Sequence, residues 1–195
     1  MRLPVVVATL MMIGIFSGLC AAQETSREIQ EKETAVDKKI LVVYYSRTGN
    51  TKRVAEDIAA SLKADIEEIV DIRDRSGFMG YMKAGRDAMK ARLTEIGQMQ
   101  KDPADYDVVI IGTPIWAWSM TPAVRTYMVK YKSAIKQAAF FTTAGGSKPD
   151  KIVKAMEELL GMKPLGTVGF VQKEFKSANK EIYDKKIVEF TTLLR

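Results

Sequence analysis

Blocks of apolar residues alternate with polar turns along most of the chain, and the period of the apolar positions changes from block to block. Five short runs rich in β-branched or aromatic residues predict strands at 38–45, 64–72, 106–112, 138–143 and 165–171. Four stretches with helical spacing predict helices at 51–64, 121–133, 149–160 and 177–194. Another helix is expected where apolar residues recur at Phe78, Met82, Met89, Leu93 and Ile96. This alternation predicts an α/β fold, with a parallel sheet covered by helices on both faces.

The turn after the first predicted strand is rich in side chains that donate hydrogen bonds. It reads SRTGNT, residues 46–51, and Gly49 would allow a sharp bend or a close approach of the backbone. The first amides of a helix have no intrahelical partners and lie at the positive end of its dipole. We therefore expect this turn to bind an anion, and a terminal phosphate suits its donors best. The alternative is that its serine and threonines only cap the helix.

Two further turns lie at the same predicted edge of the sheet, where ligands of open parallel sheets bind. TPIWAWSM, residues 113–120, places Trp116 and Trp118 in a predicted surface loop. The two indoles would cover a flat ligand there, or else pack under the loop or onto the following helix. TAGGSKP, residues 143–149, contains Gly145 and Gly146, which permit close backbone approach but also suit an ordinary turn.

Composition excludes several kinds of chemistry. The 195 residues include no histidine and one cysteine, Cys20. Imidazole bases, Ser/His/Asp triads and the usual zinc sites are therefore excluded. No catalytic residue or metal ligand is predicted, so any demanding chemistry would have to come from a cofactor.

The N-terminal segment has the composition of an export signal. Residues 3–22 are uncharged, follow Arg2 and end in small residues that would permit cleavage after Ala22. An uncleaved membrane anchor or a lipidated Cys20 are the alternatives, although Leu19 replaces the small residue typical of lipoprotein signals. Residues 23–38 are polar and charged and predict a tether or a fraying helix, which leaves 39–195 as the folded domain. We expect the protein to be exported to the periplasm or cell envelope.

Three motifs in order, YYSRTGNT, DVVIIGTPIWAWSMTPAV and FFTTAGG, resemble the flavodoxin family over essentially all of residues 39–195. The resemblance implies a flavodoxin-like three-layer, doubly wound five-stranded parallel sheet of order 2-1-3-4-5, with FMN as the cofactor. It implies phosphate contacts from 46–51, and a flavin ring flanked by 113–119 and 143–146. The implied cofactor-binding residues are Ser46, Arg47, Thr48, Gly49, Asn50, Thr51, Thr113, Pro114, Ile115, Trp116, Ala117, Trp118, Thr143, Ala144, Gly145 and Gly146.

The sequence departs from better-known flavodoxins in three ways. The turn at 143–146 has no aromatic residue, so we expect one ring face to be covered by Met120 or left open to a substrate. Ala117 stands where a glycine often lets a peptide flip beside the ring, and a positive φ is costly for alanine. From Lys39 onward, 26 Lys and Arg oppose 19 Asp and Glu, a balance of +7. Such a surface favours acidic partners or an anionic membrane, unless its lysines only solubilise helix ends.

These observations favour an exported or membrane-tethered FMN protein. It would transfer electrons or hydride equivalents between a reduced donor and a quinone or redox-protein acceptor. If the chain is an enzyme, it would be an FMN-dependent oxidoreductase of the NAD(P)H or quinone type. Nucleic acid is not expected as a partner, because no platform of aromatic and basic residues is present. The alternative is a cofactor-free flavodoxin-like module that binds a partner at the cell envelope.

Overall fold

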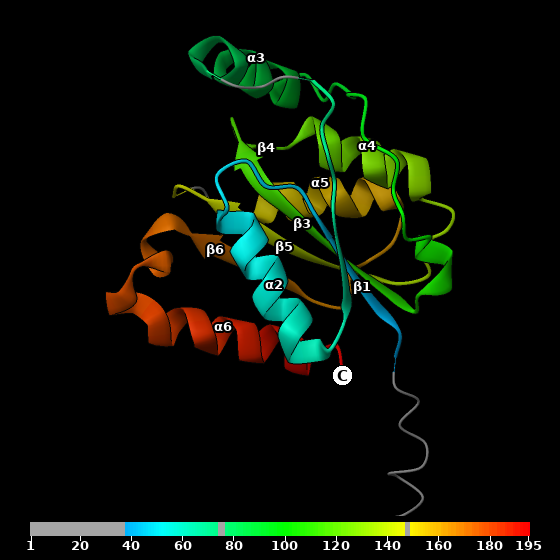
Figure 1. The fold of residues 1–195 in the computed structure, drawn as a ribbon, viewed down its shortest axis with the longest axis vertical. Helices are drawn as coiled ribbons and strands as arrows, with labels where there is room; N and C mark the ends of the chain where they lie inside the picture. The colour runs from blue at the N-terminus through cyan, green and yellow to red at the C-terminus, as the bar shows by residue number, and fades with distance from the viewer. Residues whose placement is uncertain (1–37, 74–76, 147–148) are drawn as a thin grey trace, which may run out of the picture. The chain divides into compact units, whose positions relative to one another are not determined.

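A computed structural model describes residues 38–73, 77–146 and 149–195 (Figure 1). The predicted signal or anchor at 1–22 and all but the last residue of the predicted tether at 23–38 lie outside the described residues. Within the described ranges, no helix is both long enough and apolar enough to cross a membrane.

The domain is built on a parallel sheet. Its strands, in spatial order, are β2 (Asp65–Glu68), β1 (Ile40–Tyr44), β3 (Val108–Trp116), β5 (Ala138–Ala144) and β6 (Thr167–Val171). A short strand, β4 (Ser119–Met120), pairs antiparallel with the end of β3. If the parallel strands are numbered along the chain, their order is 2-1-3-4-5, as predicted. All five residues of β1 are buried, because β1 has neighbours on both edges and helices on both faces.

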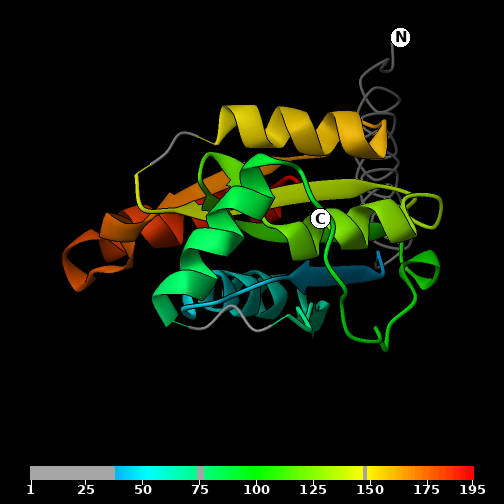
Figure 2. The same cartoon turned by 90° about the horizontal axis from the view of Figure 1, so that it is seen from above.

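Alternate residues of the strands enter two separate cores. Val42 and Ile110 pack with α2 (Asn50–Leu62) and α6 (Lys180–Thr192) on one face. Val43 and Ile111 pack with α4 (Pro122–Tyr131) and α5 (Asp150–Leu160) on the other. Figure 2 shows α5 and α2 on opposite sides of the strands. The three layers predicted from the alternation of strands and helices are therefore confirmed.

The remaining helix, α3 (Gly77–Met89), does not cover a sheet face. It lies beyond the carboxyl ends of the strands, near β4 (Figure 1), and contacts β3, β4 and α4. The helix ends before Leu93 and Ile96, because Ala91 takes a positive φ of 51° and breaks the helical path. Its buried side includes the small Ala84 and Ala88. A helix is present where one was predicted, but Met82 and Met89, two of the apolar residues that indicated it, are exposed.

Two strand boundaries also differ from the prediction. β2 ends at Glu68 rather than at residue 72, because its partner β1 ends at Tyr44, which is paired with Glu68. β3 extends through residues predicted as a loop and forms a hairpin with β4. The two turn residues, Ala117 and Trp118, have φ of 46° and 59°, and a two-residue hairpin turn of this kind usually contains glycine or asparagine. Three short 3₁₀ turns complete the fold: η1 (Pro103–Asp105), η2 (Gln172–Phe175) and η3 (Ser177–Asn179).

Candidate functional site

The turn between β1 and α2 leaves the start of α2 open to a ligand. Gly49 precedes the helix with φ of 89°, and an added Cβ there would meet nothing within 4 Å, so conformation rather than space requires the glycine. Its amide donates a hydrogen bond to Ser46 Oγ at 3.2 Å. No side chain caps α2, and its first turn has no acidic residue. The alternative that serine and threonine only cap this helix is therefore wrong.

A buried pair of hydroxyls joins this helix start to the end of β5. Thr51 Oγ1 lies 2.8 Å from Thr143 Oγ1, and either oxygen can be the donor. The two residues are 2% and 4% exposed. Whichever hydroxyl accepts within the pair keeps its own hydrogen for another acceptor. The pair therefore fixes two predicted turns against each other and still offers a hydrogen bond to a ligand.

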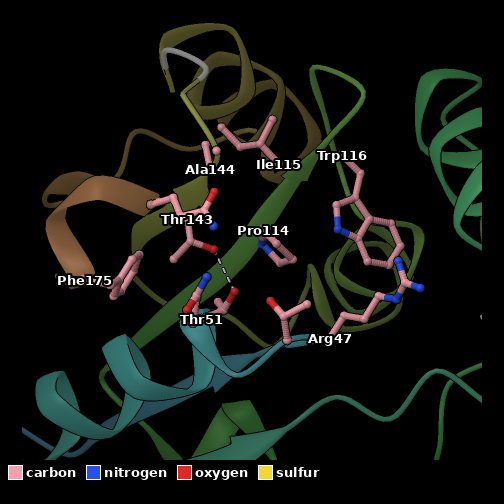
Figure 3. A pocket seen from close by; sticks show the side chains of 12 residues that line it. Arg47, Thr51, Pro114, Ile115, Trp116, Thr143, Ala144 and Phe175 are labelled. Atoms are coloured by element: carbon pink, nitrogen blue, oxygen red, sulfur yellow. Dashed lines mark hydrogen bonds between the residues drawn. The ribbon is translucent and has the colours of Figure 1, made fainter. Parts of the chain in front are cut away.

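A cavity of about 260 Å³ opens between these turns and the end of β3 (Figure 3). The predicted residues that line it are Arg47, Thr48, Asn50, Thr51, Pro114, Ile115, Trp116, Thr143, Ala144 and Gly145. Of all the described residues around it, Arg47 alone carries a charge. The three turns identified in the sequence thus meet at one site, which combines hydroxyl donors and one cation with apolar walls.

The other predicted site residues lie outside this cavity lining: Ser46, Gly49, Thr113, Ala117, Trp118 and Gly146. Ser46 and Gly49 bond to each other within the first turn. Thr113 is fully buried, and its Oγ1 accepts a hydrogen bond from the Thr121 amide at 3.2 Å, which ties β3 to the start of α4. These three residues shape or support the site. Neither Gly145 nor Gly146 needs a positive φ or has a neighbour within 4 Å of an added Cβ.

The two tryptophans have different environments. Trp116 is half-buried and meets the Tyr45 ring edge-on, with centroids 5.5 Å apart, while it also lines the cavity. Trp118 is 75% exposed at the tip of the hairpin. The structure therefore brings the first indole, but not the second, to the predicted cofactor site.

An aromatic residue that sequence analysis missed completes the cavity. Phe175 and Gln172 line it from η2, after β6. Figure 3 shows Phe175 and Trp116 on opposite sides of the bonded threonines. The Arg53 guanidinium lies 5.9 Å from the Phe175 ring centroid and holds this segment. No motif indicated these residues, because only tertiary packing brings the end of β6 here.

Of the two alternatives expected for the second ring face, cover by Met120 or a face left open to a substrate, the first is wrong. Met120 is 1% exposed and belongs to the core beneath α4 and α5, so it cannot reach a ligand in the cavity. Phe175 supplies the aromatic surface that the turn at 143–146 lacks.

The ionisable groups with shifted pKa lie away from the cavity. Burial raises the pKa of Tyr44, whose hydroxyl donates to Glu68 at 3.2 Å. Burial likewise raises the pKa of Tyr183, whose hydroxyl donates to Asp57 at 2.5 Å. These phenols stay protonated and link neighbouring elements. The described part of the chain contains no cluster of three metal-ligating side chains.

Comparisons with known proteins agree with this architecture. The Flavodoxin family model matches residues 39–190. A Lactobacillus acidophilus flavoprotein solved in complex with FMN is 24% identical, with a TM-score of 0.61 over 76% of this chain and 98% of its own. A candidate flavoprotein from Bacteroides eggerthii is 23% identical, with a TM-score of 0.59 over 76% of this chain and 98% of its own. A Streptococcus pneumonia flavodoxin is 15% identical, with a TM-score of 0.50 over 80% of this chain and 96% of its own.

The comparison with curated proteins found no match. At these identities the solved structures show a shared fold.

Proposed function

The chain belongs to the flavodoxin family, and on this premise we propose that it is an FMN-binding redox protein. The observation that carries the proposal is the uncapped start of α2, which faces the same cavity as Thr48, Thr51 and Arg47. This end of the cavity suits the phosphate of FMN. A helix N-terminus, threonine hydroxyls and a guanidinium all favour a bound anion.

The other end of the cavity suits a flat ring. Pro114, Ile115 and Trp116 supply an apolar wall from the end of β3, and Ala144 and Gly145 approach from the end of β5. An added Cβ at Gly145 would meet nothing within 4 Å, so the backbone there leaves room for a ligand. The residues present therefore fit both the phosphate and the ring of FMN.

Bound FMN would supply the redox chemistry, since it accepts and gives up electrons singly or in pairs. The protein residues bind and orient the cofactor: the first turn holds the phosphate, and Trp116 shields the ring from water. We propose that the protein transfers electrons or hydride equivalents between a reduced donor and a quinone or redox-protein acceptor. The uncharged segment at 3–22 supports an exported or membrane-tethered location.

FMN retention after desalting tests the proposal. The purified protein is mixed with FMN, desalted and examined by absorbance, beside a Thr48→Ala/Thr51→Ala variant. Each lost hydrogen bond to a charged phosphate is worth about 1.5–3 kcal/mol, so we expect at least a roughly hundredfold loss of affinity. A Thr167→Ala/Thr192→Ala variant is the matched control, because both of its threonines are exposed and outside the cavity.

Wild-type protein that loses all its flavin on desalting would refute FMN binding and leave the cofactor-free partner-binding module as the better account. If flavin is retained, stepwise photoreduction shows whether the cofactor takes up electrons one at a time or in pairs.

A further inference from the structure

A second cavity lies between α3 and the β3–β4 hairpin. Its volume is about 510 Å³. It is lined by Met82, Gly85, Arg86, Met89, Lys90, Ile115, Trp116, Ala117 and Trp118, and we refer to it as the α3 groove. Ile115 and Trp116 line the proposed FMN cavity as well, so the two cavities share a wall.

The α3 groove contains flexible, apolar side chains that are largely exposed to solvent. Met82 is 54% exposed, Met89 65% and Trp118 75%. Methionine side chains adapt to irregular ligands and make favourable contacts with aromatic rings, and an indole offers a flat surface for stacking. Apolar surface of this kind gathered around one cavity is typical of a ligand-binding site.

The charge of the α3 groove has one sign. Arg86 and Lys90 line it, and its lining includes no carboxylate. The acidic residue on the same helix, Asp87, is buried, accepts a hydrogen bond from Arg92 Nη1 at 3.2 Å and forms an ion pair with Arg73 Nη1 at 3.8 Å. Among the ion pairs found in the described ranges, none involves Arg86 or Lys90. These two cations are therefore available to an anionic ligand.

The hairpin turn presents its tryptophan to the groove at an energetic cost. Ala117 and Trp118 both have positive φ, a conformation that is unfavourable for residues other than glycine. The turn also approaches α3 closely, since a Cβ added at Gly85 would lie 3.7 Å from that of Ala117. Backbone strain of this kind is found at functional sites, and Trp118 at the tip is 75% exposed.

We propose that the α3 groove binds a planar aromatic molecule that carries a carboxylate or sulfonate group. Trp116, Trp118 and the two methionines would contact the ring, while Arg86 and Lys90 would bind the anion. A role for this ligand as a redox substrate rests on the proposed FMN function, because the shared wall places it beside the cofactor cavity. Binding of the ligand does not depend on that function.

Calorimetric titration of the FMN-saturated protein with two redox-inert probes tests this site. The probes are naphthalene-2-sulfonate and the uncharged naphthalene-2-sulfonamide, which share one ring system. We expect the wild type to bind the sulfonate at least about tenfold more tightly than the sulfonamide. An Arg86→Gln/Lys90→Gln variant should lose this preference.

The matched control is Lys83→Gln/Lys151→Gln, which removes two exposed charges that lie outside the groove and should keep the preference within about twofold. Replacement of Trp118 by leucine should weaken both probes, because it removes the stacking surface they have in common. The flavin content, read by absorbance, should be the same in all variants.

Three results would overturn the proposal. One is equal sulfonate affinity in the wild type and the Arg86→Gln/Lys90→Gln variant, and another is displacement of FMN by the sulfonate. The third is binding to phosphatidylglycerol vesicles that requires Arg86 and Lys90, without any binding of the sulfonate. If the protein retains no FMN, the proposed function fails, and titration of the same flavin-free protein still tests the groove.

Discussion

The two cavities share Trp116 but are built from different parts of the fold. The proposed FMN cavity lies at the ends of the central strands, where Thr51 and Thr143 are buried and bonded to each other. The α3 groove lies outside the sheet, between an apolar, exposed helix side and a hairpin turn with two positive φ angles. A cavity supported by the core is held rigid by packing, whereas a peripheral cavity depends on local backbone geometry. The first arrangement suits a resident cofactor and the second suits a ligand that comes and goes.

The largest effect should come from Gly112 in β3, because both cavities depend on this strand. A Cβ at Gly112 would lie 2.0 Å from Phe141 Cζ. Overpacking of this severity in a buried sheet costs about 3 kcal/mol or more, so Gly112→Ala should destabilise the protein and weaken both ligands together. Denaturant unfolding measures the loss.

Two further variants check that the loss of stability comes from the contact with Phe141. Gly146→Ala is the control and should change stability by less than about 0.5 kcal/mol, because the added Cβ would meet nothing within 4 Å. The double variant Gly112→Ala/Phe141→Leu should recover part of the loss. If the unfolding free energy of Gly112→Ala equals that of the wild type, Phe141 must move away from the added Cβ without cost, which would contradict the prediction.

The two tryptophans provide the next test, because one is shared and the other belongs to the groove. Trp116→Leu should lower stability by about 1–2 kcal/mol and weaken both FMN and naphthalene-2-sulfonate. Trp118→Leu should leave stability and FMN affinity nearly unchanged while it weakens binding of the sulfonate in the groove. Thermal unfolding and the two titrations measure these effects. Equal losses of FMN affinity in both variants would contradict the separation of the two cavities.

Relief of backbone strain in the β3–β4 hairpin should affect ligand binding in the α3 groove and the stability of the domain in opposite directions. Ala117→Gly should stabilise the protein by about 0.5–1 kcal/mol, because glycine adopts a positive φ without penalty. The same change should weaken the sulfonate, since the turn would hold Trp118 less firmly. Ala91→Gly is the matched control, with φ of 51° at the end of α3 and no contact with either cavity. It should show the gain in unfolding free energy without the loss of sulfonate affinity.

The smallest effect should come from a hydrogen bond outside both cavities. The Tyr106 hydroxyl donates to Asp65 Oδ2 at 2.6 Å, which lowers the pKa of Asp65, while burial raises the pKa of Tyr106 to about 12. Tyr106→Phe should cost less than about 1 kcal/mol near pH 7 and should not alter either titration.

The loss of unfolding free energy caused by Tyr106→Phe should depend on pH in a defined direction. Because the pKa of Asp65 is lowered, its ionised carboxylate contributes to stability above about pH 3.9, the pKa in the unfolded chain. This contribution disappears as the pH falls through the pKa of Asp65 in the folded protein. Because the pKa of Tyr106 is raised, the protonated phenol contributes to the stability of the folded state below about pH 10. This contribution is lost as the pH rises toward about 12. The gap in unfolding free energy between wild type and Tyr106→Phe should therefore narrow at both extremes. A gap that stays constant with pH would argue against this hydrogen bond.

Some residues of the predicted cofactor site could be found from a sequence motif, whereas others depend on tertiary packing. Hydroxyl side chains around Gly49 indicated the turn that we propose binds the phosphate, because its strand, glycine and helix are contiguous in sequence. Phe175 could not be found in this way, since its position depends on how η2 packs against α2 after the last strand. Trp116 and Trp118 lie two residues apart and look equivalent in sequence, yet the hairpin sends them to different environments.

The sequence by itself determined the α/β class, the strand order through the family resemblance, and the three turns at one edge of the sheet. Periodicity reports burial along a single element, so the strands and the four covering helices were predictable. The tertiary structure alone decided that α3 leaves the sheet and that a second cavity forms beside Trp116. The physical reason is that apolar spacing cannot distinguish a face that packs on a core from one, such as that of Met82 and Met89, that stays exposed around a groove.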